Sequence, residues 1–206
     1  MRLPAFLRRL RGDREGATIV EFALIAGPMC LILIGGLELA YQSMLRTSMQ
    51  GALNEAARRA TVENPQFGGF TGDTIEEKIE SSIAAIVGSL ANGATIDVEQ
   101  MSYFDFSDIG NPEKLTTDKN GNGIYDPADD CFEDANGNGV YDVDAGRSGR
   151  GGANDVVFYR ARIAARRLLP LPGFLDIPAD IEMTLETAVR NQPFANQPTP
   201  SVICPE

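Results

Sequence analysis

The chain has 206 residues, and its 43% hydrophobic and 23% charged content is ordinary for a globular protein, which excludes wholesale disorder. It contains no histidine, so the Ser-His and Cys-His dyads of common hydrolases and every histidine-containing zinc site are excluded. The formal net charge of −11 argues against a nucleic-acid partner, because nucleic-acid phosphates would repel such a surface.

The charge is distributed unevenly along the chain. Residues 1–16 hold five arginines against two acids, a net charge of +3, whereas residues 118–144 hold eight acids against one lysine, a net charge of −7. The sequence therefore predicts a basic leader at 1–16, a long helix at 17–63, an α+β domain at 66–194 that carries an acidic insert at 111–155, and an irregular tail at 195–206.

An uncharged apolar run extends from Phe22 to Leu37, between Glu21 and Glu38. It is somewhat shorter than the roughly 20 apolar residues that a membrane-spanning helix needs, unless flanking side chains reach the headgroups. Because the arginines lie on one side of the run, we expect a single-pass anchor with its N-terminus in the cytoplasm and the following domain outside. A cleavable secretory signal and a buried core helix are the alternatives.

The helical pattern continues beyond the apolar run. Apolar residues recur at steps of three and four as far as Ala60, and Asn64-Pro65 ends the pattern. One helix is therefore predicted from Ala17 to Val62, with a length on the order of 70 Å at 1.5 Å per residue. A helix that is half apolar and half amphipathic needs other helices or a membrane to cover it.

The run GATIVEF, from Gly16 to Phe22, resembles the processing site of type IV pilins and pseudopilins, in particular the TadE-like minor pilins of the Flp (tight adherence, Tad) pilus system. In that family a prepilin peptidase cuts after the glycine on the cytoplasmic side, and the fifth mature residue is a glutamate followed by an aromatic residue. A cut between Gly16 and Ala17 gives Glu21 and Phe22 these two positions.

The resemblance implies a non-enzymatic pseudopilin that takes part in assembly of an adhesive pilus. Its implied partners are other pilins, the Tad secretion machinery and the prepilin peptidase, and its implied location is the inner membrane or the extracellular pilus. A carboxylate such as Glu21 at the membrane face of an apolar helix is costly, and a neighbouring subunit's α-amino group could neutralise it. Glu21 could also simply mark the interfacial edge of an ordinary anchor.

The domain after the long helix has the pattern of an α+β fold with a small antiparallel sheet packed on helices. A second helix is predicted from Thr71 to Gly93, with Thr74 and Glu77 at the spacing of a capping box. A strand with a bulge near Gln100 is predicted over 95–106, and two alternating strands at 157–166 and 181–190 are expected to pair antiparallel, with arginines of one facing glutamates of the other. This is the layout that the resemblance to pilins implies.

The acidic insert contains two copies of one pattern, DKNGNGIYDPAD at 118–129 and DANGNGVYDVDA at 134–145, which we call the first loop and the second loop. They resemble the calcium-loop pattern D-x-[DN]-x-[DN]-G-x5-E, whose alternating oxygen-bearing side chains and glycine fold the backbone around the ion. The predicted ligands of two Ca²⁺ ions are Asp118, Asn120, Asn122, the Ile124 carbonyl, Asp126, Asp129 and Asp130 in one loop, and Asp134, Asn136, Asn138, the Val140 carbonyl, Asp142 and Asp144 in the other.

Each copy departs from the pattern at its end. The twelfth position is Asp129 in the first loop and Ala145 in the second, so we expect compact loops instead of standard EF-hands. Turns between short hairpins would explain the same glycine-rich strings without a metal. Cys131 and Cys204 would both face an oxidising exterior under this topology, and a disulfide between them is our guess.

Two other functions fit parts of the sequence. One is an unprocessed, single-pass membrane-anchored module that binds calcium at the cell surface or in the periplasm. The other is a membrane-anchored hydrolase that uses an aspartate-bound metal, which is weaker because the sequence offers no nucleophile and base pair.

Overall fold

The computed structural model describes residues 15–66, 68–69, 71–91, 93–169, 173 and 176–205, so residues 1–14 of the predicted leader lie outside the described residues. The elements are α2 (Glu15–Ala60), α3 (Ile75–Leu90), β1 (Thr95–Tyr103), a short 3-10 helix η1 (Phe106–Asp108), β2 (Leu115–Thr117), β3 (Cys131–Asp134), β4 (Arg147–Ser148), β5 (Val156–Arg166), β6 (Asp180–Arg190) and β7 (Ser201–Ile203).

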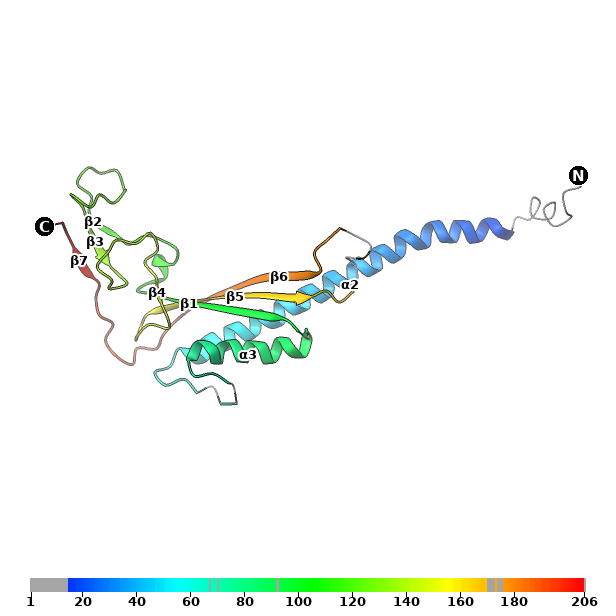
Figure 1. Ribbon diagram of the computed structural model, residues 1–206, viewed down its shortest axis with the longest axis horizontal. Coiled ribbons are helices and arrows are strands. Elements are labelled where there is room, and N and C mark those ends of the chain that lie inside the picture. The colour runs from blue at the N-terminus through cyan, green and yellow to red at the C-terminus, as the bar shows by residue number, and fades with distance from the viewer. Residues whose placement is uncertain are drawn as a thin grey trace, which may run out of the picture.

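The strands form two antiparallel sheets. The larger sheet has the order β4-β1-β5-β6, and the smaller one has the order β2-β3-β7. Figure 1 shows an elongated molecule in which the N-terminal half of α2 extends away from the domain, while the smaller sheet lies at the opposite end. The predicted α+β class with a long N-terminal helix is confirmed. The tail, which we expected to be irregular, contributes β7 because its backbone pairs with β3.

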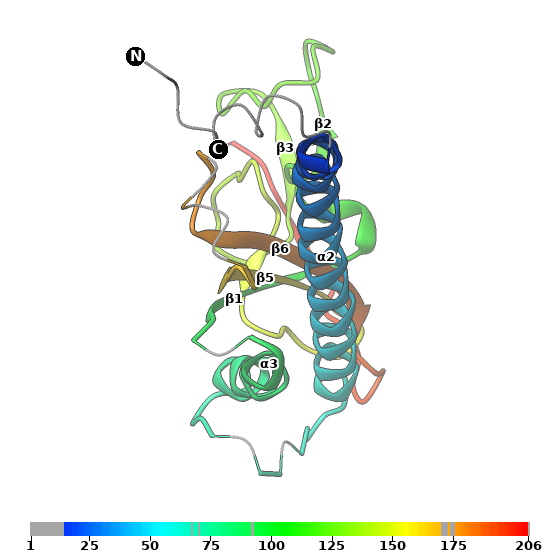
Figure 2. The ribbon, with the colours of Figure 1, turned by 90° about the vertical axis from the view of Figure 1, so that its right-hand side faces the viewer.

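The core lies between the larger sheet and the two helices. The C-terminal half of α2 packs on β6 and on α3, and α3 packs on β1, so both helices cover one face of the sheet (Figure 2). Leu45, Met49, Leu53 and Ile79 are fully buried against Tyr159, Ile163 and Leu185 of the strands. Each such side chain contributes roughly 1.5–3 kcal/mol through burial, which anchors this half of α2 to the domain.

Helix α3 begins with the capping box that its sequence predicts. The Thr74 N–H donates to the Glu77 carboxylate over 3.2 Å, and the Glu77 N–H donates to the Thr74 hydroxyl oxygen over 3.2 Å. The backbone hydrogen bonds from Asp73 and Thr74 lower the pKa of Glu77. The helix starts at Ile75 because these bonds satisfy amides that its first turn leaves unpaired.

Strand β1 differs from its prediction. We expected a bulge near Gln100, but β1 pairs with β5 in one unbroken register from Thr95↔Ala164 to Tyr103↔Val156. The alternation of apolar and polar residues shifts by one position near Gln100 because both faces of β1 are covered at its C-terminal end. Gln100 faces the core and donates to the Tyr159 hydroxyl over 3.0 Å, whereas Met101 and Tyr103 lie against Gly146 of the insert on the other face.

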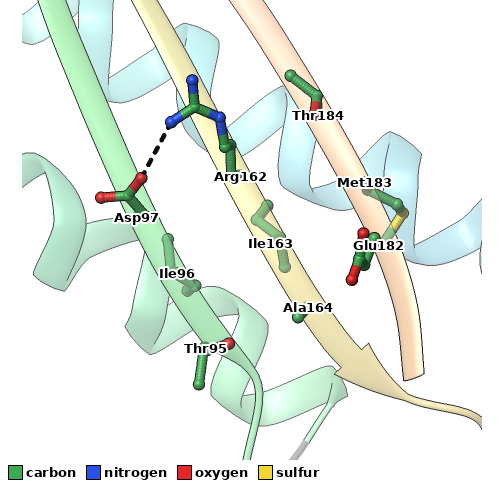
Figure 3. Close-up of a pocket in the computed structure, with 9 residues that line it drawn as sticks. All are labelled: Thr95, Ile96, Asp97, Arg162, Ile163, Ala164, Glu182, Met183 and Thr184. Carbon is green, nitrogen blue, oxygen red and sulfur yellow. Dashed lines mark hydrogen bonds and ion pairs between the residues drawn. The ribbon is translucent and has the colours of Figure 1, made fainter. Parts of the chain in front are cut away.

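Strands β5 and β6 pair over their full length, as predicted. Arg160 faces Glu186 in the register, and Arg160 Nε lies 2.8 Å from a Glu186 carboxylate oxygen. Arg162 instead pairs with Asp97 and Glu99 of β1, at 3.3 and 3.0 Å. Figure 3 shows the Asp97–Arg162 pair at a shallow hollow of about 340 Å³ on this sheet, with the helices behind the strands. Exposed pairs of this kind contribute only about 0–1 kcal/mol each.

Candidate functional site

The first and second loops fold in the same way. The Asp118 carboxylate accepts the backbone N–H groups of Gly121 and Gly123, both over 2.7 Å, and the lowered pKa of Asp118 follows from these bonds, with Gly123 the largest cause. In the second loop the Asp134 carboxylate accepts those of Gly137 and Gly139, over 2.8 and 2.9 Å. All four glycines have φ between 70° and 80°, which L side chains rarely adopt, so the turn requires them.

The asparagines of the two loops also have matching roles. Asn120 and Asn136 each accept the backbone N–H of the asparagine two residues later, over 3.0 Å in both loops. Those asparagines, Asn122 and Asn138, accept the N–H of Ile124 and Val140, over 2.7 Å in both loops. The shared sequence pattern therefore produces one shared hydrogen-bonded turn.

The remaining predicted ligands have different surroundings. In the second loop the Asn136 and Asn138 side-chain amides donate to Asp142 over 2.7 and 2.6 Å, so three predicted ligands meet there. Asp129 pairs with the Lys119 ammonium group, and Asp144 accepts from the Tyr103 hydroxyl over 3.4 Å and from the Gly146 N–H over 3.0 Å. Asp144 thus points to β1. Among the described residues, no group of three or more acidic or cysteine side chains is spaced to hold a metal ion.

Two carboxylates that hold the loops are deeply buried. Asp130, which we predicted as a ligand, is fully buried and accepts the backbone N–H groups of Lys119 and Asp126, each over 2.9 Å. Glu113, which the sequence analysis missed, is 2% exposed and accepts those of Ala135 and Asp142, over 2.8 and 3.1 Å. Burial raises the pKa of Glu113.

An aromatic cluster lies between the two loops. Tyr125 stacks on Tyr141 with 4.2 Å between ring centroids, and Phe132 contacts both rings edge-on at 5.3 and 5.5 Å. The two tyrosines occupy the eighth position of their loops, so the repeat itself could have indicated that they are equivalent. The cluster gives the insert a small core of its own.

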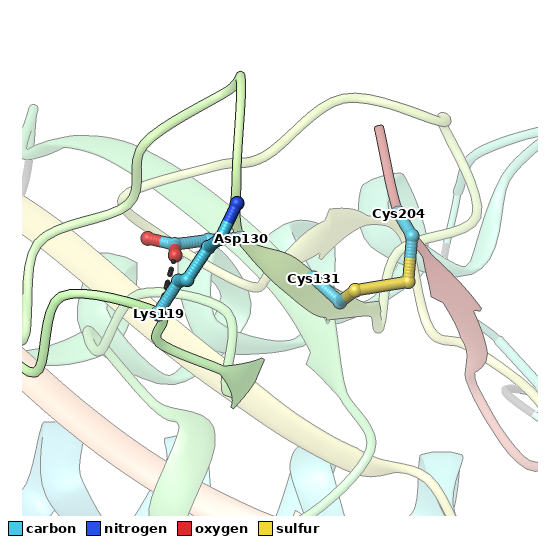
Figure 4. Close-up of a disulfide and its surroundings, with 4 residues drawn as sticks. All are labelled: Lys119, Asp130, Cys131 and Cys204. Carbon is cyan, nitrogen blue, oxygen red and sulfur yellow. Dashed lines mark hydrogen bonds between the residues drawn. A yellow bond between two sulfur atoms is a disulfide. The ribbon is translucent and has the colours of Figure 1, made fainter. Parts of the chain in front are cut away.

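The smaller sheet is tied to the tail by a covalent bond. The structure has a disulfide between Cys131 in β3 and Cys204 next to β7, with a Cα–Cα distance of 4.3 Å (Figure 4). This is the pair that we guessed from the sequence. It connects residues 73 apart and holds the C-terminal tail beside the first loop. Cys30 is a free, exposed thiol in α2.

The N-terminal half of α2 is uncovered. Ile19, Leu24 and Ile32 are 71%, 71% and 74% exposed, and the apolar side chains between them are also largely exposed. By length and composition the helix could cross a membrane, and none of its most apolar window is buried in the domain. A buried core helix, one of our alternatives, would be covered by the rest of the chain. This segment instead offers a continuous apolar surface to its surroundings.

Comparison with known protein families gives a match for the N-terminal part of the chain. The family model described as TadE-like protein matches residues 16–58. Residues 16–58 are TadE-like. No curated protein and no solved structure matches the chain. The TadE-like segment covers nearly all of α2, so the sheets and the insert are described by the structure alone.

The TadE-like match covers less than half of the chain, so it describes this segment and not the whole protein. The matched residues include the part of α2 that is long and apolar enough to cross a membrane.

The predicted processing residues lie in the first turns of the TadE-like segment. Gly16, Glu21 and Phe22 are exposed on α2, and Ala17 lies in the same helical backbone. The space around Gly16 is open, since a Cβ built there would have no neighbour within 4 Å. Glu21 and Phe22 lie at the start of the apolar run, near the N-terminal end of α2, and this end of the helix is the one farthest from the folded domain (Figure 1).

Glu38 marks the place where the TadE-like segment enters the domain. It is 3% exposed, and one of its carboxylate oxygens lies 3.5 Å from the Arg167 guanidinium group at the end of β5. Within the described part of the chain, the other oxygen has no hydrogen-bond partner. The sequence analysis saw Glu38 only as the end of the apolar run, because nothing local indicates a partner 129 residues away.

Proposed function

We propose that this protein is a TadE-like pseudopilin that takes part in assembling a Flp/Tad adhesive pilus. In this proposal a prepilin peptidase removes the leader after Gly16, and the apolar half of α2 inserts into the inner membrane or packs against other pilins. The α+β domain then lies outside the cytoplasm. The observation that carries the proposal is the uncovered apolar half of α2, which coincides with the TadE-like match. Such a surface needs lipid or neighbouring helices around it.

Glu21 has a specific task in this proposal. Once the leader is removed, each subunit has a new α-amino group at Ala17, and this cation could pair with Glu21 of a neighbouring subunit. The pairing would offset the cost of placing a carboxylate at the membrane face of an apolar helix. The exposure of Glu21 on α2 supports the idea, because the side chain is not used inside the domain.

The proposal is tested by mass spectrometry of the native N-terminus. The protein, purified from the bacterium that makes it, should begin at Ala17, and a Gly16→Val variant should keep its leader. Gly27→Ala changes another glycine of α2 that has open space around it and should be processed normally. An intact Met1 would support the unprocessed calcium-binding module instead, and a cut near Ala40 would support a cleavable secretory signal.

We also propose that the first and second loops each bind one Ca²⁺ ion. The shared turn geometry of the two copies supports this, because it places oxygen-bearing side chains around the same backbone curve twice. Two bound ions would also cancel four of the seven net negative charges of residues 118–144. Limited proteolysis is the test. Cleavage within 111–155 should slow in calcium, and equal cleavage rates in calcium and in chelator would contradict the proposal.

A further inference from the structure

The first loop is held by a residue that follows it directly. Asp130 is its thirteenth position, counted from Asp118. The Asp130 N–H donates to the carbonyl of Asp126 over 3.0 Å. One carboxylate oxygen of Asp130 accepts the N–H of Lys119 and the other accepts that of Asp126, each over 2.9 Å (Figure 4 draws the first of these bonds). Three bonds from one residue therefore join the second and ninth positions of the loop.

The second loop has no acid at the equivalent place. Its thirteenth position is Gly146, and a Cβ there would lie 2.8 Å from two ring carbons of Tyr103 and 2.9 Å from the methyl group of Met101. Contacts under about 3 Å between carbon atoms are strongly repulsive, so the packing of the insert on β1 leaves no room for a side chain. Ala145, at the twelfth position, carries no oxygen ligand either.

Glu113 makes the missing bonds from outside the repeat. Its N–H donates to the carbonyl of Asp142 over 3.0 Å, which matches the bond from Asp130 to Asp126. Its two carboxylate oxygens accept the N–H groups of Ala135 and Asp142, over 2.8 and 3.1 Å. Ala135 and Asp142 are the second and ninth positions of the second loop, so each bond has a counterpart in the first loop.

The geometry points to Glu113 as the positioning residue of the second calcium loop, in the place that Asp130 has in the first. This inference deepens the proposed calcium binding and rests on it. The Glu113 carboxylate accepts hydrogen bonds from backbone N–H groups of the second loop and not from the side chains that we propose as ligands. It acts on the ion through the loop that it shapes. Groups that orient metal ligands in this way typically change metal affinity by about 10- to 100-fold when they are removed.

The position of Glu113 also links the two loops. Glu113 precedes the first loop in the sequence but binds the second loop. In the sequence, the first loop therefore lies between Glu113 and its partners, Ala135 and Asp142. The stacked pair Tyr125 and Tyr141 connects the loops a second time. We therefore take residues 113–146 as one unit with two similar halves, in which each half has its own buried carboxylate.

The test compares Glu113→Gln with Asp130→Asn in the full chain held in detergent micelles. The first readout is amide hydrogen exchange. In Glu113→Gln, exchange should accelerate about tenfold or more at Ala135 and Asp142, and stay unchanged at Lys119 and Asp126. Asp130→Asn should give the reverse pattern. Glu133→Gln removes an equal charge from the insert without either set of bonds and should change neither pair of amides.

The second readout is the affinity of each calcium-binding step, measured by calorimetric titration. A purely structural role of Glu113 would not change the affinity of one step selectively. Each variant should weaken one of the two binding steps by about 10- to 100-fold and leave the other near its original affinity. Saturating calcium should restore slow exchange at Ala135 in Glu113→Gln. Exchange that accelerates equally at both loops, or two binding steps that stay unchanged in Glu113→Gln, would overturn the inference. If the original protein binds no calcium, the proposed calcium role fails, and the exchange pattern alone decides whether Glu113 holds the second loop.

Discussion

At the scale of single residues, Gly146 shows how one small side chain determines the arrangement of the insert. It lies against Tyr103 and Met101, which stand on the face of β1 that the helices do not cover. The hydroxyl of Tyr103 is 3.4 Å from Asp144, and burial with this carboxylate nearby raises the pKa of Tyr103 to about 12. Close packing at Gly146 therefore holds the end of the second loop against the sheet, where Asp144 accepts a hydrogen bond from Tyr103.

Gly146→Ala tests this packing. The added methyl group would meet the Tyr103 ring at 2.8 Å, so the variant should lose about 1–3 kcal/mol of unfolding free energy, measured by chemical denaturation. Gly152→Ala is the matched control, since a Cβ there would make an ordinary contact of 3.7 Å with Asp155. Equal stability of the two variants would show that the insert can move off β1 without cost.

Apart from the Cys131–Cys204 disulfide, which was a guess between cysteines 73 residues apart, the contacts that sequence analysis identified most directly join residues close in the chain. Thr74 and Glu77 cap α3 because they are three residues apart, and the two copies of the loop pattern stand out because each is continuous. Glu113 was missed because it is 29 residues from Asp142. Glu38 and Arg167 were missed as a pair for the same reason. Contacts over such distances depend on the tertiary fold, which no local spacing specifies.

At the scale of elements, α2 has two halves with different surroundings. Its predicted bounds, Ala17 to Val62, are close to the observed Glu15–Ala60, because period-3.6 spacing is a strong signal in a long helix. The helix continues through Pro28. The smaller sheet was missed because its strands have only three or four residues, too few to show a period of two. Long strands such as β5 and β6 were found for the opposite reason.

Two leucines, one in each half of α2, show the difference between the surroundings of the two halves. Leu53 is fully buried in the core, whereas Leu24 is 71% exposed. Leu53→Ala should lower the unfolding free energy of the domain by about 2–5 kcal/mol, because it removes packed atoms and leaves a cavity. Leu24→Ala should leave domain unfolding unchanged, since no part of the domain covers that side chain. Thermal unfolding of both variants in detergent, followed by near-ultraviolet circular dichroism, measures the difference, and comparable losses would mean that the exposed half packs on the domain.

At the scale of the whole molecule, the membrane-compatible half of α2 and the acidic insert lie at opposite ends (Figure 1). With α2 anchored, the insert is the part of the domain farthest from the membrane. The disulfide belongs to that outer end, since it joins β3 to the tail beside β7. It lies outside the core formed by α2, α3 and the larger sheet. The covalent bond therefore stabilises the end that has the smaller sheet and the smaller hydrophobic cluster.

Removal of the disulfide should loosen this outer end selectively. Closing a loop of 73 residues corresponds to about 4 kcal/mol in the chain-entropy estimate, and typical measured values are about 2–4 kcal/mol. In Cys204→Ser the tail residues 195–205 should become sensitive to protease, and exchange should accelerate in β3 and β7. Amides of β5 should stay protected, because their bonds to β1 and β6 do not depend on the tail. Cys30→Ser removes the free thiol as a control and should change none of these segments. Accelerated exchange throughout β5 would mean that the outer end and the core unfold together, so that the disulfide holds the whole domain.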